Sequence, residues 1–318
     1  MSIPGKILLA QVPTPLQEIK FGGKSFLIKR DDLTGCELSG NKIRKLEYIL
    51  EDAKRKRADI IFTCGGDQSN HARATTIAAK KIGLNTKLFL WGKESKHANG
   101  NLFLNKMFGA EIKYLNKDEF DNVNEIMFDE RMSLLKKKKN AYVLPEGGST
   151  TIGIWGYIQF IDELKKQVNI KTINSIVSAG GSGGTAAGML VGAALNKLNI
   201  KIVAVNVLYS QEVIKKKILQ LAEGCVLDYK LNCKINPDKL IILDGYSKEG
   251  YKSITKSKVK LIKKFAAETG ILFDPVYTGK AFNAYYDKYL KKGIGKKNIF
   301  VHTGGLFAVF GRTIEYLS

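Results

Sequence analysis

Short hydrophobic runs alternate with segments of helical periodicity along most of the chain. The runs are rich in β-branched and aromatic residues, which favour strands. They lie at 59–64, 86–91, 110–115, 175–179, 200–207 and 298–303. A continuous apolar run, such as that at 202–205, needs cover on both faces, as strands of a parallel sheet have. The alternation therefore predicts an α/β fold with doubly wound parallel sheets.

The segments between these runs carry apolar residues at the spacing of a helix face. They lie at 43–56, 69–83, 184–198 and 257–270. No internal repeat or low-complexity linker divides the chain into consecutive units. A second domain is therefore expected as an insertion into the first.

Composition is that of a folded globular protein. The chain has 318 residues, of which 44% are hydrophobic and 25% charged, so it is long enough to bury a core without disulfides or metals. No run approaches 18 apolar residues, and the N-terminal segment has too short an apolar run for a signal peptide. The expected location is the cytoplasm, with no membrane partner.

Four cysteines form no Cys-x-x-Cys pair, and three histidines are too scattered for a zinc-ligand spacing. We expect a reduced protein without a metal. The net charge of +21 raises nucleic acid as a partner. The longest basic run, Lys136 to Lys139, follows a helix-like segment at 121–135, and no nucleic-acid-binding module accompanies it. We interpret the lysines as solvated and expect no specific nucleic-acid partner.

Glycine clusters are the strongest chemical signal. The segment 175–192 reads as a strand, a glycine loop at 180–184 and a helix. Such a loop directs backbone N–H groups and a helix N-terminus at an anion, and Ser182 and Thr185 add hydroxyl donors. The segment predicts a phosphate site, with a tight turn as the plain alternative.

A nicotinamide dinucleotide is the main alternative for this loop. Gly181, Gly183 and Ala186 match the spacing of a dinucleotide-binding motif, which is weak evidence alone. The acid expected about 20 residues later to hold the ribose is missing, because no Asp or Glu lies between Thr185 and Glu212. A single phosphate monoester therefore fits better, and a nicotinamide oxidoreductase is disfavoured.

A phosphate site combined with a reactive lysine suggests pyridoxal 5′-phosphate (PLP). Lys42 follows Ser39-Gly40-Asn41 at the start of an expected helix. Burial near other cations there would lower the pKa of its amine. An ordinary surface lysine is the alternative for any one of the many lysines.

Six segments, taken together, resemble the family of D-cysteine desulfhydrases and 1-aminocyclopropane-1-carboxylate (ACC) deaminases, PLP enzymes of the tryptophan-synthase-β-like fold. They are IKRDDLTG (28–35), SGNKIRKLEYIL (39–50), CGGDQSNHAR (64–73), SAGGSGGTAAG (178–188), DPVYTGKAF (274–282) and HTGG (302–305). The resemblance spans nearly the whole chain. It implies a homodimer whose large PLP-binding domain, 1–48 plus 159–318, is interrupted by a smaller one at 49–158.

The resemblance also assigns roles to residues of these segments. Lys42 would be the Schiff-base lysine, Ser69 would lie beside the substrate carboxylate, and Asn70 would bond the ring's phenolic oxygen. Asn70 also suits the start of the helix as a cap. The phosphate would be held by Gly181, Ser182, Gly183, Gly184 and Thr185, with Lys45 beside them.

Two tyrosines match the active-site spacing of the family. Tyr277 lies in DPVYTGK and Tyr251 precedes it by 26 residues, but Lys252 to Ile254 replace the glycine and proline that usually follow. That departure leaves the role of Tyr251 open, and a core tyrosine is the plain alternative for both. For His71 and His302 we expect structural, hydrogen-bonded roles.

Two threonines bear on the reaction. ACC deaminases carry a glutamate directly after the DPVY tyrosine, where this chain has Thr278, and Thr303 in HTGG matches the desulfhydrase residue facing the ring nitrogen. A hydroxyl stabilises a cationic ring less than a carboxylate does, which favours a substrate with a good leaving group. The resemblance implies conversion of D-cysteine to pyruvate, hydrogen sulfide and ammonia. ACC deamination and elimination from cysteate, 3-chloroalanine or D-serine are the alternatives.

Overall fold

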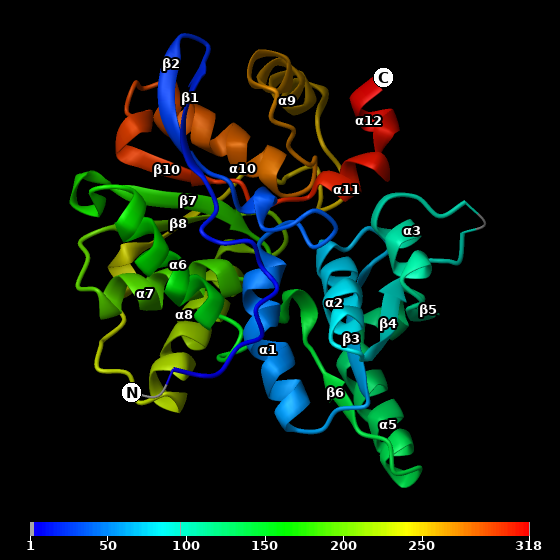
Figure 1. Ribbon diagram of the computed structural model, residues 1–318. Helices are drawn as coiled ribbons and strands as arrows, with labels where there is room; N and C mark the ends of the chain where they lie inside the picture. The colour runs from blue at the N-terminus through cyan, green and yellow to red at the C-terminus, as the bar shows by residue number, and fades with distance from the viewer. Residues whose placement is uncertain (1–2, 96, 318) are drawn as a thin grey trace.

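Two sheets organise the computed structural model, which describes residues 3–95 and 97–317 (Figure 1). The larger sheet has the order β1-β2-β10-β7-β8-β9 and the smaller one the order β5-β4-β3-β6. The strands are β1 (Leu16–Phe21), β2 (Lys24–Lys29), β3 (Ile60–Gly66), β4 (Asn85–Trp91), β5 (Glu111–Leu115), β6 (Ala141–Val143), β7 (Ser175–Gly180), β8 (Lys201–Asn206), β9 (Leu240–Leu243) and β10 (Asn298–Val301).

Helices connect the strands and cover both sheets (Figure 1). They are α1 (Lys42–Arg55), α2 (Asn70–Lys81), α3 (Gly100–Met107), α4 (Lys117–Asp121), α5 (Val123–Lys136), α6 (Trp155–Gln167), α7 (Gly184–Leu195), α8 (Gln211–Asp228), α9 (Lys256–Thr269), α10 (Thr278–Tyr285), α11 (Leu306–Phe310) and α12 (Thr313–Leu317). The six predicted strands and four predicted helices are confirmed, with ends that coincide or differ by at most three residues.

The sequence analysis missed the hairpin at one edge of the larger sheet. β1 and β2 pair antiparallel, whereas every other pair in both sheets is parallel. Gly22 and Gly23 form the turn with φ values of 54° and 76°, a conformation that glycine adopts without steric cost. The larger sheet is thus parallel except at this edge.

The core of the larger sheet follows the two-residue period of its strands. Ile176 and Ile202 face a cluster formed with α6, α7 and α8. Val177 and Val203 face a second cluster with α9 and α10, which includes Phe265 among several other aromatic rings. Burial on both faces explains why these strands are continuously apolar.

The smaller sheet is built in the same way. Ile61 packs with α1 and α2 on one face of the sheet. On the other face, Phe62 packs with Phe89 of β4 and with Met127 of α5. Its four strands lie within 49–158, and the expected boundaries at 48/49 and 158/159 fall inside α1 and α6. These domain limits stay a prediction.

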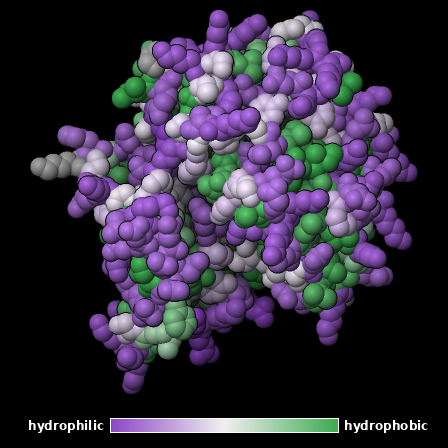
Figure 2. Space-filling model, turned by 180° about the vertical axis from the view of Figure 1, so that it is seen from behind, coloured by the Kyte–Doolittle hydropathy of each residue, from purple (hydrophilic) through white to green (hydrophobic). Residues whose placement is uncertain are grey.

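The loops after β3, β7 and β10 face the region between the two sheets, where α1 begins (Figure 1). Hydrophilic side chains cover most of the face in Figure 2, with smaller apolar patches between them. The run Lys136 to Lys139 is exposed at the end of α5. Among residues 3–95 and 97–317, no helix is long and apolar enough to cross a membrane.

Candidate active site

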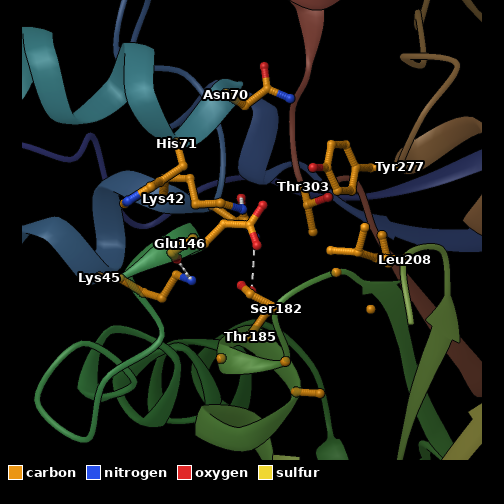
Figure 3. A pocket seen from close by; sticks show the side chains of 18 of the residues that line it. Lys42, Lys45, Asn70, His71, Glu146, Ser182, Thr185, Leu208, Tyr277 and Thr303 are labelled. Atoms are coloured by element: carbon orange, nitrogen blue, oxygen red, sulfur yellow. Dashed lines mark hydrogen bonds between the residues drawn. The ribbon is translucent and has the colours of Figure 1, made fainter. Parts of the chain in front are cut away.

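A cavity at the carboxyl ends of β3, β7 and β10 brings most of the predicted site residues together (Figure 3). All of them line it except Tyr251, which contacts the lining residue Tyr277. Its lining includes Lys42, Lys45, Ser69, Asn70, Gly181, Ser182, Gly183, Gly184, Thr185, Tyr277 and Thr303. The sequence analysis did not single out Asn41, Glu146 or Leu208, which also line it.

Lys42 is the first residue of α1, and the loop before it fits tightly against the strand end of β10. Gly40 has φ +108°, and a Cβ atom there would lie 3.0 Å from the Thr303 carbonyl oxygen. The next amide, of Asn41, donates to that same oxygen at 3.0 Å. Burial lowers the pKa of Lys42 to about 8. About a tenth of its amine is therefore neutral and nucleophilic at pH 7, far more than for an ordinary lysine.

Lys45 lies one helical turn after Lys42 and is 1% exposed. Its amine donates to the carbonyl oxygen of Gly147. Burial, and next the charge of Lys42, hold the pKa of Lys45 well below its usual value. An anion bound in the cavity would relieve this cost by pairing with the ammonium groups.

The glycine loop after β7 has the geometry of an anion cradle. Gly183 has φ +90°, and α7 begins at Gly184, so backbone N–H groups and the helix N-terminus meet at the cavity. A Cβ atom at Gly184 would lie 2.5 Å from Ser149 Oγ, which accepts from the Gly184 amide at 3.2 Å. Ser149 Oγ is also 2.8 Å from Ser182 Oγ. The loop thus needs glycine at 184.

Ser69 and Asn70 lie at the start of α2. The Ser69 hydroxyl accepts from the Ala72 amide at 3.2 Å, so Ser69, not Asn70, caps this helix. A Cβ atom at Gly65 would lie 2.6 Å from Ser69 Oγ, so the end of β3 packs directly on this hydroxyl. Asn70 is free of the capping role and its side chain lines the cavity.

His71 and His302 each make a hydrogen bond of the kind expected for a structural role, which stays a prediction. His71 Nε2 lies 2.9 Å from the Thr63 hydroxyl, which itself donates to the Leu144 carbonyl. His302 Nε2 lies 3.1 Å from the Leu272 carbonyl oxygen. Burial lowers the pKa of both rings, so they are neutral near pH 7.

Tyr251 and Tyr277 meet at their hydroxyl groups. The two oxygens are in hydrogen-bonding contact and the rings pack edge to face, with centroids 5.7 Å apart. Burial raises the pKa of both phenols, that of Tyr277 far above its usual value. The pair is therefore protonated at neutral pH and has a hydroxyl hydrogen to donate at the cavity.

The unusual loop after Tyr251 still places this tyrosine at the site. Lys280, which is 0% exposed, donates to the carbonyl oxygens of Gly250 (2.6 Å) and Tyr251 (3.2 Å). Arg312 donates to the carbonyl of Lys252 at 2.6 Å. The carbonyls of the loop are thus held by two buried or half-buried cations, and its shape does not depend on a glycine and a proline.

Only one of the two threonines faces the cavity. Thr303 lines it, whereas the Thr278 hydroxyl donates to Asp274 Oδ1 at 2.5 Å within a buried turn. The same carboxylate accepts from the backbone amides of Tyr277 and Thr278 at 2.8 Å each. Thr278 therefore serves to fix the turn that presents Tyr277.

Glu146 is a carboxylate at the cavity that the sequence analysis missed. It follows β6 in the turn before Gly147, which the glycine cluster at 147–148 marks in the sequence. Burial raises its pKa, and the Tyr209 hydroxyl donates to Oε2 at 3.3 Å. Among the described residues, no group of three or more His, Cys, Asp or Glu could hold a metal ion.

The cavity fits PLP on its own geometry: it combines an anion cradle, a buried amine of lowered pKa and hydroxyl donors. Residues 7–304 match the family described as "Pyridoxal-phosphate dependent enzyme". The chain belongs to this family, and it is a PLP-dependent enzyme.

Two relatives and one crystal structure define its position within the family more narrowly. A Thermotoga maritima protein named "Putative 1-aminocyclopropane-1-carboxylate deaminase" is 39% identical, over 97% of this chain and 98% of that one. An Arabidopsis thaliana "Bifunctional D-cysteine desulfhydrase/1-aminocyclopropane-1-carboxylate deaminase, mitochondrial" is 34% identical, over 98% and 80%. A crystal structure described as that of "the ACC deaminase homologue" has a TM-score of 0.89 and 36% identity, over 99% and 96%. These similarities confirm the family resemblance and the tryptophan-synthase-β-like fold.

Proposed function

We propose that this enzyme catalyses α,β-elimination on D-cysteine. The reaction takes D-cysteine and water to pyruvate, hydrogen sulfide and ammonia. The proposal is carried by the side of the cavity that the C-terminal half of the chain forms. Tyr277 and Thr303 line this side with neutral hydroxyl groups, and the Thr278 hydroxyl points instead to Asp274. A neutral hydroxyl supports a cationic pyridine ring weakly, which suits a substrate whose leaving group departs readily.

Lys42 and the glycine loop would hold the cofactor from opposite sides. Lys42 would bind its aldehyde carbon, and the backbone amides of 181–185 with the Thr185 hydroxyl would bind its phosphate. Lys45 would add a positive charge beside the phosphate. When bound, PLP supplies the electron-withdrawing ring that makes the substrate α-hydrogen acidic.

Substrate groups would meet the remaining polar side chains. The Ser69 hydroxyl would bind the substrate carboxylate, with the positive end of α2 beside it. The Lys42 amine, once released from the cofactor, would take the α-proton, because its pKa of about 8 suits a base near neutral pH. The protonated hydroxyl pair of Tyr251 and Tyr277 would supply a proton to the departing sulfur.

The chemistry balances without a further reactant. The α-hydrogen leaves as a proton, the carbon–sulfur bond breaks with both electrons on sulfur, and a proton converts hydrosulfide to hydrogen sulfide. The released 2-aminoacrylate takes up water and yields pyruvate and ammonia. No oxidant or reductant is consumed.

ACC deamination is the second candidate, and it rests on the relatives that carry that name. The same tyrosine pair could deliver a proton to a ring carbon. Initial rates of keto-acid release from D-cysteine, L-cysteine, D-serine and ACC at equal concentrations separate the two. We expect D-cysteine to be fastest, D-serine slow because hydroxide leaves poorly, and ACC to give little 2-oxobutyrate. ACC turnover at or above the D-cysteine rate would establish the second candidate instead.

A further inference from the structure

The amide of Asn70 has a defined orientation in the cavity wall. Asn101 Nδ2 donates to Asn70 Oδ1 at 3.0 Å, the one hydrogen bond of the Asn70 side chain among the described residues. Figure 3 shows that its oxygen points away from Lys42 and Thr303. The NH2 group of Asn70 is therefore left without a protein partner, on a residue that lines the cavity.

Asn101 can hold Asn70 in this orientation because its own amide is fixed. Arg73 Nε donates to Asn101 Oδ1 at 3.0 Å, and arginine has only donors, so the oxygen of Asn101 must face Arg73. The Nδ2 hydrogens of Asn101 then go to Asn70 Oδ1 and to the Gln68 carbonyl oxygen at 2.9 Å. Asn101 is 0% exposed, so water does not compete for these bonds.

Arg73 is in turn anchored to the segment before Lys42. Its guanidinium is 1% exposed and donates to the carbonyl oxygens of Glu37 and, at 2.7 Å, of Ser39. It also lies over the ring of Phe307, 5.1 Å from the centroid. One buried cation thus fixes both the loop that precedes the cofactor lysine and the amide of Asn101.

We propose that Asn101 is a positioning residue that turns the NH2 group of Asn70 toward the phenolic oxygen of PLP. The proposal rests on the cofactor role of Asn70 and does not depend on which amino acid is the substrate. Without the bond from Asn101, the Asn70 amide could rotate by half a turn. It would then present a lone pair, rather than a donor, to an anionic oxygen.

Asn101→Asp tests this role. The carboxylate keeps the volume and the acceptor for Arg73, but it removes both donors. We expect the Kd for PLP, measured by titrating the cofactor-free full chain, to rise about tenfold, as for loss of a hydrogen bond to a charged group. The pH midpoint of the visible absorption band of the bound cofactor should move upward, because a less stabilised anion holds its proton more tightly.

Asn105 provides the matched control. It lies one turn later on α3, is also 0% exposed, and neither its Oδ1 nor its Nδ2 has a partner among the described residues. Asn101→Ala and Asn105→Ala remove the same atoms from two buried positions of the same helix. The first should weaken PLP binding about tenfold, and the second should leave the Kd and the absorption band unchanged. If Asn101→Asp does not fold, the comparison of these two alanine variants provides the test instead.

A double variant shows whether Asn101 acts through Asn70. In an Asn70→Ala background, Asn101→Asp should weaken PLP binding by less than about twofold more, because the group that it orients is gone. Additive effects, an unchanged Kd and band in folded Asn101→Asp, or an Asn70→Ala variant that binds PLP normally would each overturn the proposal. Because no substrate is present, a wrong substrate assignment would leave these results unchanged.

Discussion

Asn41 donates its side-chain amide to the hydroxyl of Thr185, with 2.9 Å between Nδ2 and Oγ1. The bond fills an acceptor position of the hydroxyl, so the hydroxyl hydrogen is left to donate into the cavity that Thr185 lines. Because Asn41 precedes Lys42, the pair also joins the start of the lysine helix to the anion loop. The sequence analysis recognised Thr185 but had no signal for this partner.

Thr185→Val should weaken PLP binding about tenfold, because it keeps the shape of the side chain but removes a hydroxyl donor to a charged phosphate. Thermal unfolding of the cofactor-free protein should change much less. Thr185→Ser is the control, since it keeps the hydroxyl, and its affinity should stay within about threefold of the parent. Titration with PLP measures the Kd of the parent and of the two variants. Equal affinities would place the phosphate elsewhere.

Lys42→Ala should give a folded protein that forms no covalent link to PLP, because Lys42 is the amine we expect at the cofactor carbon. Borohydride reduction followed by mass spectrometry of peptides should map a pyridoxyl group to Lys42 in the parent protein. Lys45→Ala should keep that adduct, since the Lys45 amine is held at the Gly147 carbonyl oxygen and is expected beside the phosphate. An adduct on another lysine in the parent would contradict the assignment.

The strands and helices that the pattern predicted include the most continuously apolar segments, such as β7, β8 and α7. The β1–β2 hairpin was missed because its strands carry lysines. One of these, Lys29, is 0% exposed, with Glu163 and the Thr14 carbonyl oxygen as partners. A local pattern cannot reveal that a charge 134 residues away stabilises a buried lysine.

Prediction of the site was limited in the same way. Motif residues such as Lys42, Asn70 and Thr185 come together in one cavity, although their roles, the homodimer and the cytoplasmic location stay predictions. Glu146 and Asn101 were missed because only the folded chain brings them to the site. Glu146 lies in the turn after β6 of the smaller sheet, and Asn101 lies on α3, which carries no recognisable motif. The sequence also could not show that the Thr278 hydroxyl points to its buried partner Asp274.

The contribution of Lys42 to the stability of the cofactor-free protein should become more favourable as the pH rises from about 8 to about 10.4. Burial lowers the folded-state pKa of Lys42 to about 8, whereas an unfolded lysine titrates near 10.4. Between these values the unfolded chain binds more protons, so the free energy of unfolding rises with pH, by up to ~3 kcal/mol for this group. Urea unfolding at several pH values measures the slope.

Lys42→Met isolates that contribution. Lys280 also has its pKa lowered to about 8 by burial, and it contributes with the same sign. The slope should therefore be less positive in Lys42→Met than in the parent, and the variant should be more stable than the parent at pH 7. An unchanged slope would mean that the Lys42 amine is solvated in the cofactor-free state.

Lys280→Met should lower the rate of keto-acid release far more than Lys252→Gly does. Lys280 Nζ binds the carbonyl oxygens of Gly250 and Tyr251, and so holds the Tyr251 hydroxyl against Tyr277. Its removal leaves these two carbonyls without their donor and frees the loop, so we expect kcat to fall about tenfold or more, with PLP affinity little changed.

Lys252→Gly restores the glycine that usually follows this tyrosine in the family, and it is the matched control. Lys252 pairs with Asp67 at 3.1 Å and lies over Trp91, 4.1 Å from the ring centroid, but a third of its side chain is exposed. Its loss should cost less than ~1 kcal/mol of stability and leave kcat within about threefold, because Lys280 still fixes the loop. Tyr251→Phe should lower kcat about as much as Lys280→Met does. The variant that combines these two changes should be no slower than either single variant. If Lys252→Gly is the slower enzyme and Lys280→Met is nearly normal, the loop is held by the contacts to Asp67 and Trp91 instead.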